Sequence, residues 1–168
     1  MMENKILQAG EPAGAPLQCP TKPLYRILVV DDDSDIRQLS AEVLIHSGYE
    51  VDAAADGAAA WEALQIKAFN LLITDHNMPG LTGVELVRKL RSARMALPVI
   101  MSTGRLPTKE LAQNPSLQLA AMLPKPFSVE ELLGTVTKVL RATVSASGQI
   151  EPPPDWRSQP TADDLQLC

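Results

Sequence analysis

Short apolar runs alternate with amphipathic stretches along the middle of this chain. A continuous apolar run is typical of a strand buried on both faces, whereas apolar residues three or four positions apart are typical of a helix with one buried face. The runs predict five strands, at 26–30, 50–55, 70–74, 98–102 and 120–123. The stretches that follow them predict five helices, of which the fourth, at 108–119, is weaker and is interrupted by Pro115.

Polar residues mark the starts of four of these helices. Asp33 or Ser34 can cap the first helix and Asp56 the second, because their side-chain oxygens accept hydrogen bonds from backbone N–H groups. The third and fifth helices open with the capping-box patterns Thr82-x-x-Glu85 and Ser128-x-x-Glu131. Strands that alternate with helices predict an α/β fold with a parallel sheet and right-handed crossovers.

The two ends of the chain differ from the middle in composition. Residues 1–23 and 145–168 are rich in proline and show no apolar period, so we expect flexible tails around one domain at 24–144. Cys19 and Cys168 lie in these tails, so no disulfide framework is expected. The chain has no apolar run of membrane-spanning length and no signal-peptide pattern, so we expect a cytoplasmic protein without a membrane partner.

The charge balance excludes one class of function. The chain has 15 basic and 20 acidic residues, a formal net charge of −5 at pH 7. A basic footprint for nucleic acid is not visible, so we expect no nucleic-acid partner. The basic group on and after the third predicted helix is expected to form a solvated face; its members are Arg88, Lys89, Arg91 and Arg94.

Charged and hydroxyl side chains follow the predicted strands. The first strand is followed by Asp31 and Asp32, the third by Asp75, the fourth by Thr103 and the fifth by Lys125. In a parallel sheet the carboxyl ends of the strands share one edge, where ligands bind. Carboxylates brought close together raise one another's pKa and cost stability unless a cation intervenes. Mg²⁺ suits carboxylate oxygens, so the sequence predicts a magnesium site at this edge.

The same residue types suit phosphoryl transfer. Asp75 can act as a carboxylate nucleophile that forms an aspartyl phosphate. Mg²⁺ and Lys125 would hold the oxygens of the transferring group, and the Thr103 hydroxyl could donate a hydrogen bond to one of them. Phosphoryl transfer needs mainly positioning and charge stabilisation, which these groups supply.

Four motifs contain these residues: Ile27-Leu-Val-Val-Asp-Asp-Asp33, Ile73-Thr-Asp-His-Asn-Met-Pro79, Met101-Ser-Thr-Gly104 and Lys125-Pro-Phe127. Together, over about residues 24–143, they resemble the receiver domain of two-component response regulators, of the single-domain chemotaxis type. The resemblance implies a doubly wound, flavodoxin-like fold in which five parallel strands have the order 2-1-3-4-5 and are joined by five helices.

The resemblance also implies a role for each site residue. Asp75 is the phosphoacceptor, and Thr103 and Lys125 bind its phosphoryl group. Lys125-Pro126 is expected to be a cis peptide. The implied Mg²⁺ ligands are Asp31, which assists through water, Asp32, Asp75 and the backbone carbonyl of Asn77. The protein is then no enzyme, apart from its own magnesium-dependent phosphorylation and dephosphorylation.

The implied partners are proteins. A histidine kinase or a histidine phosphotransfer protein supplies the phosphoryl group, and a downstream protein binds the face around Thr108–Leu140. Only a short Pro-rich segment follows this face, so we expect a stand-alone receiver, or a receiver separated from a larger kinase.

One position departs from the family pattern. Receivers often carry an aromatic residue three positions before the lysine, and this chain has Met122 there. The usual readout by rotation of a ring is therefore in question, which leaves open a receiver-like binding module that phosphorylation does not regulate. A second alternative is a phosphatase of the haloacid dehalogenase type, which Asp31-x-Asp33 faintly resembles, although Asp35 stands where that family has Thr or Val.

Overall fold

The computed structural model describes residues 25–104 and 115–147 of the chain. Five parallel strands form one sheet in the order β2-β1-β3-β4-β5, which confirms the predicted topology. The strands are β1 (Arg26–Val30), β2 (Glu50–Ala54), β3 (Leu71–Asp75), β4 (Val99–Thr103) and β5 (Ala121–Pro124). Asp75 and Thr103 are thus the last residues of their strands. The apolar runs predict strands that end one residue earlier, at Thr74 and Ser102.

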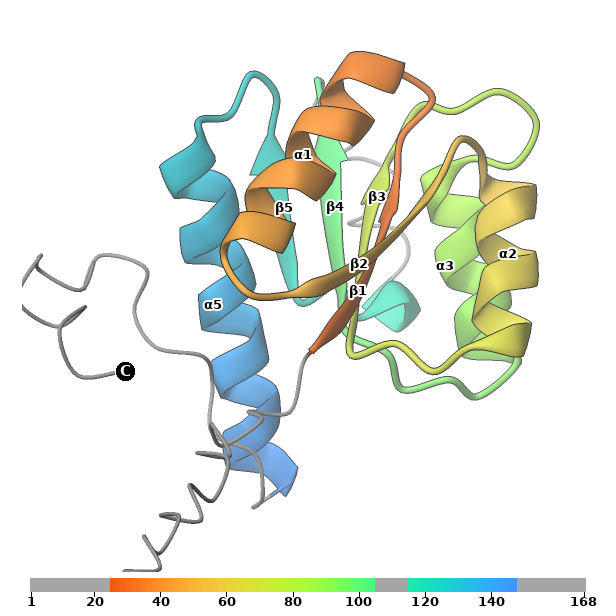
Figure 1. Ribbon diagram of the computed structural model, residues 1–168. Coiled ribbons are helices and arrows are strands. Elements are labelled where there is room, and N and C mark those ends of the chain that lie inside the picture. The colour runs from red at the N-terminus through yellow and green to blue at the C-terminus, as the bar shows by residue number, and fades with distance from the viewer. Residues whose placement is uncertain (1–24, 105–114, 148–168) are drawn as a thin grey trace, which may run out of the picture.

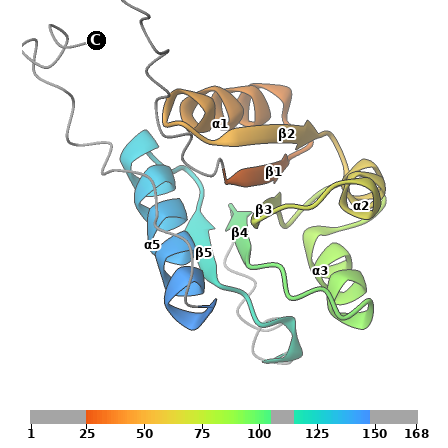
Figure 2. The same cartoon turned by 60° about the horizontal axis from the view of Figure 1, so that its bottom comes forward.

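Helices cover both faces of the sheet. They are α1 (Ser34–His46), α2 (Gly57–Ile66), α3 (Gly83–Ser92) and α5 (Val129–Ser147). Helices α1 and α5 lie on one face, and α2 and α3 lie on the other (Figures 1 and 2). Most of the expected helix at 108–119 falls outside the described residues, and its described part is a short 3₁₀ turn, η1 (Pro115–Leu117).

The predicted caps are present at the helix starts. The Asp33 side chain accepts hydrogen bonds from two backbone N–H groups of α1, and Asp56 caps α2. Thr82 and Glu85 form a reciprocal capping box at α3. Ser128 and Glu131 exchange the same pair of hydrogen bonds at α5. Each cap satisfies backbone donors that have no partner inside the helix.

Two apolar cores lie on opposite faces of the sheet. Alternate residues of the buried strands point to opposite sides, so Leu28 and Leu72 pack toward α2 and α3, and Ile27 and Ile73 pack toward α1 and α5. All four side chains are at most 4% exposed. Burial on both faces explains why the runs in the central strands β1, β3 and β4 are mainly apolar rather than alternating.

The prediction of a uniformly solvated basic face is wrong for Arg91. Arg88, Lys89 and Arg94 are exposed, but Arg91 is half-buried because its position in α3 turns it toward the chain that follows. Its guanidinium donates hydrogen bonds of 2.8–3.2 Å to four backbone carbonyls, those of Met95, Leu97, Leu117 and Gln118. Arg91 therefore connects α3 to η1.

The predicted tail at 1–23 lies outside the described residues, as does the tail at 145–168 beyond the end of α5. Within the part of the chain that the structure describes, no helix is long and apolar enough to cross a membrane.

Candidate functional site

Three buried polar side chains lie together at the edge of the sheet where the parallel strands end. Asp31 follows β1, Asp75 ends β3 and Thr103 ends β4. Asp31 is 3% exposed, Asp75 5% and Thr103 1%, and burial this deep is unusual for the two carboxylates. The central strands place them together, because β1 pairs with β3 and β3 pairs with β4, with Asp75 opposite Ser102.

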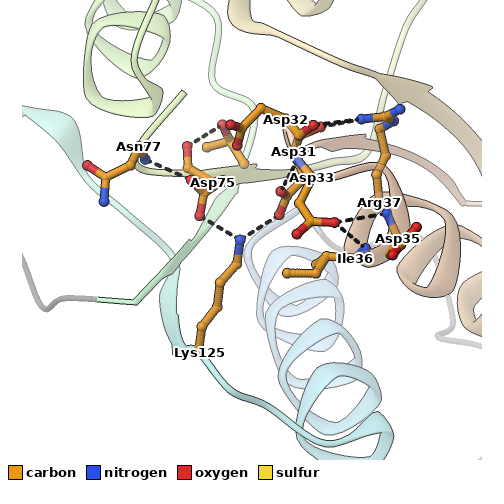
Figure 3. A network of polar contacts seen from close by, with 10 residues as sticks. Asp31, Asp32, Asp33, Asp35, Ile36, Arg37, Asp75, Asn77 and Lys125 are labelled. Carbon is orange, nitrogen blue, oxygen red and sulfur yellow. Dashed lines mark hydrogen bonds and ion pairs between the residues drawn. The ribbon is translucent and has the colours of Figure 1, made fainter. Parts of the chain in front are cut away.

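Lys125 connects two of these carboxylates. Its Nζ lies 2.7 Å from Asp31 Oδ2 and 2.8 Å from Asp75 Oδ1 (Figure 3). The backbone N–H of Lys125 donates to the Thr103 carbonyl at 2.8 Å, which ties the lysine to the end of β4. The Lys125-Pro126 peptide is cis, as the family resemblance implies.

Burial and the contacts of Lys125 act in opposite directions on the pKa values of this cluster. Desolvation raises the pKa of the Asp31 carboxyl, although the hydrogen bond from Lys125 acts in the opposite direction. Burial lowers the pKa of Lys125, but its hydrogen bonds to Asp31 and Asp75 outweigh that effect and leave the pKa above its usual value. The lysine therefore stays cationic at neutral pH, and one ammonium faces two buried carboxylates.

Asp32 and Asn77 lie at the rim of this cluster. Both residues are exposed. The backbone N–H of Asn77 donates to Asp75 Oδ2 at 2.8 Å, so the loop after β3 folds back over the carboxylate (Figure 3). The Asn77 side chain points away from Lys125 in the same view. Asp33 caps the start of α1, as the sequence predicts.

The donor set fits a magnesium ion. Mg²⁺ commonly takes one or two carboxylates and keeps several waters. In Asp31 and Asp75 each carboxylate oxygen accepts one hydrogen bond or ion pair, which leaves acceptor capacity for a cation. Among the described residues, no three acidic, histidine or cysteine side chains form a ready-made metal cluster. The site therefore suits a hydrated ion at the surface rather than a closed protein cage.

The structure also assigns parts of the site that the sequence reasoning missed. A Cβ at Gly83 would collide with the backbone oxygen of Asp75, so glycine lets the start of α3 lie against the end of β3. The signal in the sequence that could have indicated this contact is a glycine at the first position of α3, because glycine is a poor helix former. Arg37 reaches back from α1 to the backbone of Asp31, and no local pattern indicated this contact.

A pocket of about 400 Å³ lies beside Lys125, between α1 and the segment that joins β5 to α5. Its lining is mainly apolar and includes Ile36, Leu39, Phe127 and Val129. Leu39 is 59% exposed and Val129 is 40% exposed. This places a partly exposed apolar surface next to the buried acidic cluster.

Met122, the residue in the usual aromatic position, lies within β5 opposite Met101. It is half-buried. The departure from the family pattern is therefore located in the sheet, two strands from Asp75.

The comparisons with known proteins agree with this geometry. Residues 27–137 match the family described as the response regulator receiver domain. Protein PetR of Rhodobacter capsulatus is 39% identical over 120 residues, which are 71% of this chain and 50% of PetR. Response regulator MprA of Mycobacterium ulcerans is 39% identical over 118 residues, 70% of this chain and 51% of MprA. The chain thus spans about half the length of these curated relatives.

Solved structures of similar proteins share the fold. The chemotaxis response regulator CheY4 of Vibrio cholerae is 36% identical with a TM-score of 0.64, over 69% of this chain and 98% of CheY4. The response regulator TrrA of Thermotoga maritima, solved in complex with Mg²⁺ and BeF, is 31% identical with a TM-score of 0.62, over 69% of this chain and 99% of TrrA. By its sequence motifs, its sheet order and these matches, the chain belongs to the response regulator receiver domain family of two-component systems.

Proposed function

We propose that this chain is a phosphorylation-controlled receiver that accepts a phosphoryl group on Asp75 and signals by protein–protein contact. Receiver domains are generally signalling modules rather than enzymes, and they act with histidine kinases and downstream targets. The observation that carries the proposal is the Lys125 ammonium between the buried carboxylates of Asp31 and Asp75. It supports Asp75 as the acceptor because the same ammonium can neutralise phosphoryl oxygens there.

The proposed reaction transfers the group from a phosphohistidine of the kinase or of a histidine phosphotransfer protein. An Asp75 carboxylate oxygen attacks phosphorus, the P–N bond breaks, and the histidine of the donor leaves with the electron pair of that bond. Lys125 stabilises the phosphoryl oxygens as the charge moves. Thr103, buried at the end of β4, donates its hydroxyl hydrogen bond to one of these oxygens.

Receiver domains generally bind Mg²⁺ at the phosphorylation site. In this chain we assign its ligands to Asp31, Asp32, Asp75 and the Asn77 carbonyl. Bound there, Mg²⁺ supplies positive charge to the phosphoryl oxygens. The two buried carboxylates and the complex of TrrA with Mg²⁺ and BeF support this assignment.

The proposed partners bind two surfaces. The pocket beside Lys125 suits the kinase or phosphotransfer protein, because its apolar lining adjoins Lys125, which contacts the acceptor carboxylate. The downstream protein binds the face around Thr108–Leu140, part of which lies outside the described residues. We propose no nucleic-acid contact, which the net charge of −5 supports. One relative, TctD of Salmonella typhimurium, is named a transcriptional regulatory protein, and this chain spans 56% of it.

Two further expectations from the sequence become part of the proposal. The receiver comprises residues 24–144, with tails at 1–23 and 145–168, and the apolar cores around its sheet support a single domain in the middle of the chain. Helix α5 continues past the expected boundary, to Ser147. The protein works in the cytoplasm, where response regulators typically act.

Phosphorylation by acetyl phosphate tests the proposal directly. The wild-type chain should gain the mass of one phosphoryl group when Mg²⁺ is present and none after chelation, and Asp75→Asn should gain none. Asp33→Asn is the matched control, because asparagine preserves the helix cap and the variant retains Asp75. Equal phosphorylation of wild type and Asp75→Asn would rule out Asp75 as the acceptor.

Met122 favours one alternative, a receiver-like binding module that phosphorylation does not regulate. In that case the phosphorylated protein keeps the conformation of the free protein, since no aromatic ring at this position reports on Thr103. Amide chemical shifts of β4 and β5 distinguish the two functions. Shifts that change with Mg²⁺ and BeF₃⁻ support the switch, and shifts that stay unchanged while BeF₃⁻ binds support the module.

A further inference from the structure

Arg37 contacts the loop that carries the acidic residues. It lies near the start of α1 and is half-buried. Its Nη1 donates to the Asp31 carbonyl at 2.7 Å and lies 3.5 Å from the Asp32 carbonyl (Figure 3). A short hydrogen bond from a charged donor is among the stronger polar contacts in proteins. The guanidinium thus connects α1 to the residues that follow β1.

The hydrogen-bond acceptors of Arg37 are backbone carbonyls, although four carboxylates, those of Asp31, Asp32, Asp33 and Asp35, lie two to six positions before it in the sequence. Among the described residues, Asp31, Asp32 and Asp33 make one ion pair, which joins Asp31 to Lys125 and not to Arg37. An arginine that paired with Asp32 would compete with a cation for its oxygens. By binding the backbone instead, Arg37 leaves these carboxylate oxygens available.

Other contacts restrain the same loop from different directions. The Asp31 N–H donates to the Ala54 carbonyl at 3.3 Å, and the Asp33 N–H donates to Asp31 Oδ1 at 3.0 Å. Arg37 adds restraint on the carbonyl side of Asp31. The backbone sets the direction of each Cα–Cβ bond, so a fixed Asp31–Asp32 backbone limits the positions that both carboxylates can reach.

We propose that Arg37 is a positioning residue for Mg²⁺, holding the backbone of Asp31 and Asp32 so that their carboxylates are ready to bind the ion. The inference rests on the proposed function, since it concerns the same metal site. Two effects of Arg37 on Mg²⁺ have opposite signs. Positioning strengthens binding, whereas repulsion between like charges weakens it. The sign of the change in Mg²⁺ affinity therefore decides between them.

The test uses the full chain with Arg37→Met, Arg37→Lys and the matched control Arg88→Met, which removes one positive charge from an exposed position. The apparent dissociation constant for Mg²⁺ follows from melting temperatures across a MgCl₂ series. The rate of phosphorylation by acetyl phosphate is measured across the same series. It gives separately the Mg²⁺ concentration needed for half of the maximal rate and the rate at saturating Mg²⁺.

Arg37→Met should weaken Mg²⁺ binding about tenfold, the lower end of the effect seen when a residue that orients a metal ligand is lost. Arg37→Lys should recover part of the loss, since its ammonium can still donate to the Asp31 carbonyl. Saturating Mg²⁺ should restore most of the phosphorylation rate, and Arg88→Met should behave like wild type.

Unchanged or tighter Mg²⁺ binding in Arg37→Met overturns the positioning role, because charge repulsion would then be the larger effect. A wild-type chain that neither binds Mg²⁺ nor becomes phosphorylated contradicts the proposed function instead. If Arg37→Met melts at a lower temperature than wild type without Mg²⁺ but binds Mg²⁺ with unchanged affinity, Arg37 contributes to stability alone. That result also overturns the proposal.

Discussion

The cluster of Lys125, Asp31 and Asp75 is the part of the molecule where single side chains matter most. The lysine side chain is 17% exposed, and the two carboxylates are 4% and 7% exposed. Charges this far from water interact strongly, and they also cost desolvation energy. The ammonium therefore offsets a repulsion between two carboxylates that the proposed phosphoryl chemistry requires to be close.

Replacing Lys125 by methionine should lower the free energy of unfolding by about 3 kcal/mol in buffer without Mg²⁺, because two buried carboxylates lose their cation. Urea denaturation measures the change. Lys138→Met, at an exposed position of α5, should change stability by less than about 0.5 kcal/mol. A Lys125→Met protein as stable as wild type would show that the carboxylates do not depend on the ammonium.

The pH dependence of stability should report the carboxyl of Asp31. Its pKa in the folded protein lies above the ordinary value of 3.8 because of burial, so the folded state binds more protons than the unfolded state between these two values. Wild type should therefore gain stability relative to Asp31→Asn as the pH falls through the folded-state pKa. Denaturation of both proteins without Mg²⁺, from pH 7 down to about pH 4, measures the difference. A wild-type protein that loses stability relative to Asp31→Asn on acidification would contradict the raised pKa.

At the scale of elements, the junction between β3 and α3 determines how Asp75, the proposed acceptor, is held. The Gly83 N–H donates to the His76 carbonyl at 3.1 Å, and the glycine leaves no room for a side chain beside the Asp75 backbone. The capping box of Thr82 and Glu85 begins α3 at the same point. A local signal for a helix start thus coincides with a long-range packing requirement.

Two glycine substitutions separate these effects. Gly83→Ala should lower the free energy of unfolding by roughly 1–3 kcal/mol, because the added methyl overlaps backbone that cannot easily move. Gly134→Ala in α5 should raise it by about 0.5–1 kcal/mol, because its Cβ meets open space and alanine favours the helix. Urea denaturation of both variants gives the two values. Equal signs would show that crowding at Asp75 is not what requires glycine at position 83.

At the scale of the whole molecule, the sheet separates two apolar cores while joining them into one domain. Each core takes alternate side chains of the same strands, and α2 and α3 cover one while α1 and α5 cover the other. The site lies at the edge of the sheet where loops from both layers meet. This arrangement lets the loops differ between proteins without disturbing either core.

Val87 of α3 and Val136 of α5 provide a test of this separation, since each is 0% exposed in its own core. Each Val→Ala change should cost about 2 kcal/mol, from lost burial and the remaining cavity. The double variant should lose the sum of the two within about 0.5 kcal/mol. A coupling energy above about 1 kcal/mol in a double-mutant cycle would show that the sheet transmits packing changes between its faces.

The sequence by itself determined the five strands, four of the five predicted helices, the sheet class and which polar residues stand at the carboxyl edge of the sheet. Continuous apolar runs specify buried parallel strands because local burial leaves its period in the chain, and capping residues specify helix starts because they act within one turn. The residues after each strand were predictable as one cluster, since parallel strands end at a common edge.

Only the tertiary structure decided which groups in that cluster contact one another. Lys125 and Asp31 are 94 positions apart, and their pairing depends on the register of the strands between them. The same holds for Arg91, whose carbonyl partners at η1 make it half-buried, and for Arg37, which bonds backbone rather than carboxylates. Residue types and spacing specify which charges are present, whereas distances of a few ångströms, and thus the electrostatic energy, arise only when the cores have packed.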